Sequence, residues 1–151
     1  NSKSPASWRP RALSFCPVNS LCREVDTPMP HFVIDCSESV LSLADPGELM
    51  QSVFQAAEST GLFATSGVGG IKVRLNPYSH FTNVDGHEHF VHVFANIMEG
   101  RNQEQKSDLS RRIVSTLKLL LPTVEIISMN IRDFEKATYC NRAVLEANEA
   151  G

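Results

Sequence analysis

A proline follows directly after the first methionine of this sequence, and it would gain unusual chemistry if it became the first residue of the chain. Met29 is the first methionine in a chain of 151 residues, and Pro30 follows it. Proline is small enough for methionine aminopeptidase to remove a methionine that precedes it. If translation began at Met29, the mature chain would therefore begin at Pro30. Its ring nitrogen would then be a free secondary amine, which can accept a proton and return it.

The segment before this proline does not read like the rest of the chain. Residues 1–28 show neither helical nor alternating apolar spacing. They lack the apolar run of a secretory signal, and their prolines oppose the amphipathic helix of a transit peptide. Codons for residues 23–25 can contain GGAGGT, a bacterial ribosome-binding sequence. We therefore expect residues 1–28 to be a non-native or disordered extension, and residues 29–151 to form the domain.

Three histidines invite a metal-binding interpretation. His87 and His89 occupy alternate positions, and two histidines so placed on a strand can ligate zinc. His92 falls on the opposite face of an extended strand, and the spacing marks no further ligand. We expect His87 and His89 to be exposed, His92 to be a hydrogen-bonded core residue, and no metal to be bound. A zinc-dependent enzyme using His87 and His89 is the less favoured alternative.

Composition excludes several classes of protein. The chain has 14 basic and 17 acidic residues, a net charge of −3, and no block of basic residues. This balance disfavours nucleic acid and anionic membranes as partners. No apolar run approaches the roughly 18 to 20 residues that cross a bilayer. The four cysteines form no CxxC pair, which fits a reducing cytoplasm with Cys36 and Cys140 as small buried groups.

Periodicity after Met29 predicts a first strand, helix and strand. Residues 31–36 are rich in strand formers. Asp45 can cap a helix that has Pro46 at its first position and stops at Gly61. Apolar and charged residues alternate over residues 71–75, which predicts a strand, and Pro77 should end it.

A second unit repeats this order. Residues 89–98 form a long, nearly apolar run of the kind found inside a sheet. Asn102 can cap a helix that runs to about Leu121, and residues 124–131 read as a strand before a short helical or irregular tail. Two such units predict an α/β (α+β) fold in which a sheet packs against two helices.

Two stretches together resemble a known family. They are MPHFVIDCS at residues 29–37 and IMEGRNQEQK at residues 97–106, with STGLF at residues 59–63 between them. The sequence from Pro30 to the tail resembles the tautomerase superfamily, and specifically the 5-carboxymethyl-2-hydroxymuconate isomerase family. The resemblance implies two βαβ units forming a four-stranded sheet covered by two helices, assembled as a homotrimer. It also implies a cofactor-free keto-enol isomerase that acts on an unsaturated hydroxy or oxo dicarboxylate or tricarboxylate in aromatic catabolism.

The resemblance further implies roles for individual residues. Pro30, as the N-terminal residue, would be the general base, kept neutral by burial and by nearby cations. Arg101, in the EGR turn, would bind a substrate carboxylate and stabilise the charge of the dienolate.

Four further residues are candidates for substrate binding. The family pattern places an arginine after a Gly-Ile pair, whereas this chain has Lys72 there and Arg74 two residues on. Either would bind the second carboxylate, and His31 and Phe32 are further candidates for the substrate pocket. Taken singly, Pro30 also fits an ordinary strand-edge position. Arg101, Lys72 and Arg74 also fit exposed surface positions. The departure at Lys72 leaves a second hypothesis open, a non-catalytic trimeric binding module with the same fold.

Overall fold

The computed structural model describes residues 29–64, 67 and 69–151. The predicted extension at residues 1–28 lies outside this range. The main elements, in chain order, are β1 (His31–Ser37), α1 (Pro46–Glu58), β2 (Lys72–Tyr78), β3 (Phe90–Met98), α2 (Gln103–Leu120), β4 (Ile126–Phe134) and α3 (Arg142–Glu149). Short 3-10 helices lie at Glu38–Ser42, Val84–Gly86 and Lys136–Thr138.

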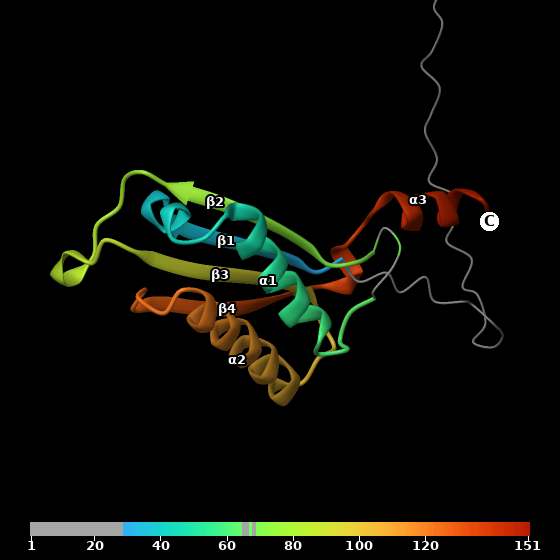
Figure 1. Cartoon of the computed structure of the whole chain (residues 1–151). Coiled ribbons are helices and arrows are strands. Elements are labelled where there is room, and N and C mark those ends of the chain that lie inside the picture. The colour runs from blue at the N-terminus through green and yellow to red at the C-terminus, as the bar shows by residue number, and fades with distance from the viewer. Residues whose placement is uncertain (1–28, 65–66, 68) are drawn as a thin grey trace, which may run out of the picture.

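The four strands form one sheet in the order β2-β1-β3-β4. β1 and β2 are parallel, β3 and β4 are parallel, and β1 and β3 join the two units in antiparallel register. Both α1 and α2 cover the same face of the sheet, while α3 lies beyond one end of it (Figure 1). The predicted architecture of two strand-helix-strand units, with a sheet against two helices, is therefore confirmed.

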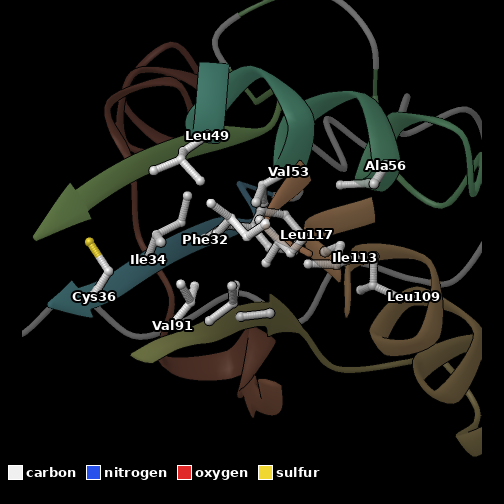
Figure 2. Packing of buried hydrophobic residues seen from close by; sticks show 14 of the residues in the cluster. Phe32, Ile34, Cys36, Leu49, Val53, Ala56, Val91, Leu109, Ile113 and Leu117 are labelled. Carbon is white, nitrogen blue, oxygen red and sulfur yellow. The ribbon is translucent and has the colours of Figure 1, made fainter. Parts of the chain in front are cut away.

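The core lies between the sheet and these two helices. In Figure 2 the labelled side chains of α1 and α2 face those of Phe32 and Ile34 on β1 and Val91 on β3. The fully buried large side chains are Phe32, Ile34, Val40, Leu49, Val53, Val91, Val93, Ile97, Leu109, Ile113, Leu117 and Leu121. Among the described residues, the buried cluster runs from Phe32 to Val124. A chain beginning at Pro30 therefore keeps every residue of this cluster.

Two strands end later than predicted, and β4 begins at Ile126 rather than at residue 124. β2 continues through Pro77 to Tyr78, because it is an edge strand and one of its sides needs no backbone donors. β4 continues to Phe134, which pairs with Met98 at the end of β3. Local sequence shows neither the edge position of β2 nor the length of the partner strand.

Several predicted burials are also wrong. His87 and His89, which were expected to be exposed, are partly buried. Cys36 is buried as expected, and burial, followed by the neighbouring Asp35 carboxylate, raises its pKa to about 11. Cys140 is exposed, because it lies in the tail before α3 rather than in the core. His92 is hydrogen-bonded but lies on the helix-free face, since it alternates with the buried Val91 and Val93.

Among the residues that the structure describes, no helix combines the length and apolar character required to span a membrane.

Candidate active site

Four strand ends meet at one end of the sheet. β1 and β2 begin there, and β3 and β4 end there, because the two parallel pairs run in opposite directions. We call this the Pro30 end of the sheet. Pro30 is buried directly before β1, and its carbonyl accepts a hydrogen bond from the Lys72 backbone N–H at 3.0 Å. The antiparallel register pairs His31 with Asn96, so Pro30 lies beside the last residues of β3.

The EGRN sequence builds the turn that carries Arg101 at this end. Gly100 has φ of +118°, a conformation that favours glycine. Asn102 then caps α2, and its side chain accepts from the Gln105 N–H at 2.9 Å. The Gln105 side chain accepts in return from the Asn102 N–H at 3.0 Å. A glycine and a capping box therefore fix the backbone on both sides of Arg101.

The Arg101 side chain is held as firmly as its backbone. Its guanidinium donates to the carbonyl of Met98 at 3.0 Å and to the carbonyl of Leu62 at 2.8 Å. It also lies over the ring of Phe63, with 5.2 Å between Cζ and the ring centroid. These contacts join the turn after β3 to the loop after α1. They leave further N–H donors of the guanidinium for an anion.

Phe32 supports this arrangement from within the core. Its ring meets that of Phe63 edge to face, with centroids 5.9 Å apart. Phe32 is completely buried and Phe63 is 6% exposed. Phe32 therefore contributes packing beneath Phe63 in this chain, and the structure shows no surface of Phe32 open to a substrate.

The remaining predicted cations lie on the opposite side of the sheet. His31 pairs with Lys72 across β1 and β2, so their side chains and that of Arg74 share the helix-free face. Arg74 donates to His31 Nδ1 at 3.2 Å. Burial, then the charges of Arg74 and Lys72, lower the pKa of His31. Lys72 Nζ donates to the Gly70 carbonyl at 3.0 Å. The structure thus groups His31, Lys72 and Arg74, and places Arg101 with the core side.

Sequence reasoning missed the part that the tail plays here. The Phe134 carbonyl accepts from the Glu99 N–H at 3.0 Å, and the Glu99 carboxylate accepts from the Lys136 N–H at 2.9 Å. The ring of Tyr139 stacks on Phe134, with centroids 5.1 Å apart. These contacts fasten the tail to the Arg101 turn. One residue of the sequence did indicate an ordered helix in the tail. Asn141 is a good helix cap, and its side chain accepts from the Val144 N–H.

The two histidines of the zinc hypothesis contact different partners. His87 Nδ1 lies 3.1 Å from the Glu125 carboxylate, and His89 Nδ1 lies 2.7 Å from the Ser39 hydroxyl. Within the described ranges, no three side chains of His, Cys, Asp or Glu are arranged to hold a metal ion. The zinc hypothesis therefore has no third protein ligand in this part of the chain.

Comparison with known proteins gives the family. Residues 30–147 match the family model of 5-carboxymethyl-2-hydroxymuconate isomerase. The chain is 27% identical to the 5-carboxymethyl-2-hydroxymuconate Delta-isomerase of Escherichia coli over 92 residues, covering 60% of this chain and 71% of that protein.

Solved structures share the fold. A 5-carboxymethyl-2-hydroxymuconate isomerase from Deinococcus radiodurans R1 superposes with a TM-score of 0.65 at 22% identity, covering 82% of this chain and 96% of that one. A fused 4-OT wild-type symmetric trimer superposes with a TM-score of 0.61 at 16% identity, covering 78% and 98% of the two chains. The fold is that of the tautomerases. With its family model matched from Pro30 to the last helix, the chain belongs to the 5-carboxymethyl-2-hydroxymuconate isomerase family and is an isomerase.

Proposed function

We propose that this isomerase interconverts the enol and keto forms of an unsaturated hydroxy or oxo dicarboxylate or tricarboxylate. 5-Carboxymethyl-2-hydroxymuconate, the compound in the name of its relatives, is the expected substrate, and aromatic catabolism is the expected setting. The observation that carries the proposal is the position of Arg101. Its guanidinium lies at the Pro30 end of the sheet, where the carbonyl of Met98 and the carbonyl of Leu62 in the loop after α1 hold it.

In this proposal Pro30 is the N-terminal residue and its ring nitrogen is the general base. The amine removes a proton from the substrate hydroxyl, and the same nitrogen delivers a proton to a carbon of the conjugated chain. An α-amino group has a pKa of about 7.7 to 8.0, and a secondary amine is more basic. Burial of Pro30 and the nearby cations favour the neutral amine that a base requires.

Arg101 has the charge-stabilising role. As the proton leaves the hydroxyl, negative charge spreads over the dienolate and its carboxylate. A guanidinium that is already oriented stabilises this charge without reorganising during the reaction. The contacts with Met98, Leu62 and Phe63 provide this preorganisation.

Lys72 or Arg74 is proposed to bind the second carboxylate. Both lie on the helix-free face, away from the core side on which Arg101 contacts Phe63. That face also presents Val33, Phe90 and Phe94, an apolar set that a second copy of the chain would cover. We therefore propose a homotrimer in which this face lies between subunits, and the existence of trimers among fused 4-OT proteins of similar fold supports the trimeric state. Sedimentation equilibrium should give three times the chain mass.

A free Pro30 nitrogen requires that no residue precede it in the working protein. We accordingly propose that residues 1–29 are absent from the active form. Mass spectrometry of the natively expressed protein should find Pro30 at the N-terminus. A native chain that retains Met29 or earlier residues would contradict the proposed base.

Activity tests the function as a whole. The chain beginning at Pro30 should ketonise phenylenolpyruvate, a small enol, and should act more efficiently on 5-carboxymethyl-2-hydroxymuconate. The second carboxylate gives the cations a further group to bind. Failure to accelerate either reaction above the buffer rate, in protein shown by circular dichroism to be folded, would contradict the proposal.

A further inference from the structure

The side chain of Met29 lies against the C-terminal segment. The side-chain amide of Asn141 donates to Met29 Sδ at 3.5 Å. A cavity of about 400 Å³ opens beside this contact. Its lining residues are Met29, Asn141, Arg142, Ala143 and Glu146. Two segments 112 positions apart in sequence thus meet around one cavity.

Met29 is joined to the nitrogen of Pro30, so the cavity that Met29 lines lies one residue along the chain from the proposed base. If the chain begins at Pro30, the volume of the Met29 side chain is added to this cavity. The amide of Asn141 then loses its contact with the sulfur. The space that Met29 leaves then extends from the cavity to the Pro30 nitrogen, to which Met29 is bonded in this structure.

We propose that Asn141 is a substrate-binding residue of this isomerase. Its side-chain amide donates a hydrogen bond to a carboxylate or enolate oxygen of the substrate, in the place that Met29 occupies in this structure. The inference rests on the proposed function, since it requires Pro30 to be the first residue. It adds the C-terminal helix to a site so far built from Pro30, Arg101 and the strand cations.

The geometry of Asn141 suits this role. Its side-chain oxygen accepts from the Val144 N–H at 2.9 Å, as the cap of α3. The oxygen is therefore committed to the helix, and the NH2 group is the end directed at Met29 Sδ and at the Tyr139 hydroxyl, 3.3 Å away. An NH2 group only donates hydrogen bonds, which matches the oxygens of an anionic substrate.

The tail that carries Asn141 is fixed to the turn that carries Arg101. The Glu99 carboxylate accepts from the Lys136 N–H at 2.9 Å, and Tyr139 stacks on Phe134 at the end of β4. The two substrate-binding groups therefore belong to one connected piece of structure. Ala143 adds an apolar surface to the cavity wall, which fits the carbon chain of a conjugated diacid.

Replacement of Asn141 by aspartate separates binding from folding. Aspartate has the same shape and can still cap α3, but it has no N–H to donate and it repels an anion. In the chain beginning at Pro30, Asn141→Asp should raise KM for 5-carboxymethyl-2-hydroxymuconate by about 10- to 100-fold, the effect of losing a hydrogen bond to a charged group. It should change kcat less than about threefold, because the base is intact. The matched control is Asn148→Asp, which places the same charge on an exposed position of α3 and should leave KM unchanged.

A second variant tests the cavity. Ala143→Phe fills it and should raise KM similarly, whereas Ala147→Phe, at an exposed position of α3, should not. Binding of muconate, the unsubstituted dienedioate, measured by calorimetry, should weaken in parallel with KM. If the unmutated chain is active but Asn141→Asp and Ala143→Phe keep KM and muconate affinity within twofold, Asn141 does not bind substrate, and the proposed function still stands. If the unmutated chain beginning at Pro30 is inactive, the proposed function fails and this inference fails with it.

Discussion

The guanidinium of Arg101 lies over the ring of Phe63, 5.2 Å from Cζ to centroid, and Phe63 in turn rests edge to face on Phe32 in the core. A chain of contacts thus runs from the hydrophobic core to the cation proposed to bind substrate. The carbonyl of Met98, at the end of β3, and the carbonyl of Leu62, in the loop after α1, hold the same guanidinium. The cation is therefore oriented by the fold before any substrate arrives.

Removal of this cation should reduce catalysis strongly. In the chain beginning at Pro30, Arg101→Ala should lower kcat/KM by on the order of 10² to 10³, the effect of losing one preorganised charge stabiliser. Arg101→Lys should restore only part of the loss, because an ammonium lacks the planar fork of donors. Steady-state kinetics measure these values. The control is Arg111→Ala, which changes an exposed arginine of α2. A value of kcat/KM within threefold of the parent for Arg101→Ala would remove this residue from the mechanism.

The ring of Phe63 should matter for activity as well as for folding. Phe63→Leu removes the face beneath the guanidinium and the edge contact with Phe32, and should lower the free energy of unfolding by about 1 kcal/mol. Because Arg101 loses part of its support, kcat/KM should also fall by about three- to tenfold. Urea unfolding and kinetics measure the two effects. The comparison variant Phe81→Leu changes an exposed ring and should leave kcat/KM unaltered; equal losses in both variants would contradict the support role.

The acid stability of the protein should depend on His31. In the folded chain His31 Nδ1 accepts a hydrogen bond from Arg74, which requires the neutral imidazole, and the pKa of His31 is lowered from 6.5. The unfolded chain therefore binds more protons than the folded chain below about pH 6.5, and stability falls as the pH is lowered through this range.

Thermal melts of the whole chain at pH 7.5 and 5.5 check this sign. His31→Gln, which has no titrating group, should show a smaller drop in Tm between the two pH values. His80→Gln, at an exposed histidine after β2, should keep the parental drop. If Tm of His31→Gln falls as much as that of the parent between the two pH values, another group causes the acid sensitivity.

The cap beside Arg101 should contribute measurably to stability. Asn102→Ala removes the side-chain oxygen that accepts from the Gln105 N–H, and should lower the free energy of unfolding by about 1 kcal/mol. Asn102→Asp keeps an acceptor oxygen and should lose little. Guanidinium unfolding of both variants makes the comparison, and identical losses would show that the cap oxygen is not the cause.

Local signals predicted the order of the elements and much of the Arg101 turn. Strand-forming and helical spacings mark β1, α1, β3 and α2, and a possible cap at Asn102 was visible from its residue type. β2 and β4 were found but ended too early. Their ends depend on an edge position and on the length of a partner strand, which are properties of the assembled sheet.

The less predictable parts of the site depend on contacts between distant segments. Phe63 belongs to a stretch that helped to mark the family, yet only the packing shows its ring under Arg101. The meeting of Met29 with Asn141 depends on how the tail returns to the start of β1. The direction of each side chain follows from strand parity, which correctly places Lys72 and Arg74 on one face but does not show which element covers that face.

One comparison tests the proposed base most directly. The value of kcat/KM for 5-carboxymethyl-2-hydroxymuconate is measured for the chain beginning at Pro30 and for the same chain after chemical acetylation confined to its N-terminal nitrogen. Acetylation turns the amine into an amide without a basic lone pair, so activity should fall to the level without enzyme while the circular dichroism spectrum stays unchanged. Equal values of kcat/KM before and after acetylation would show that another group moves the proton.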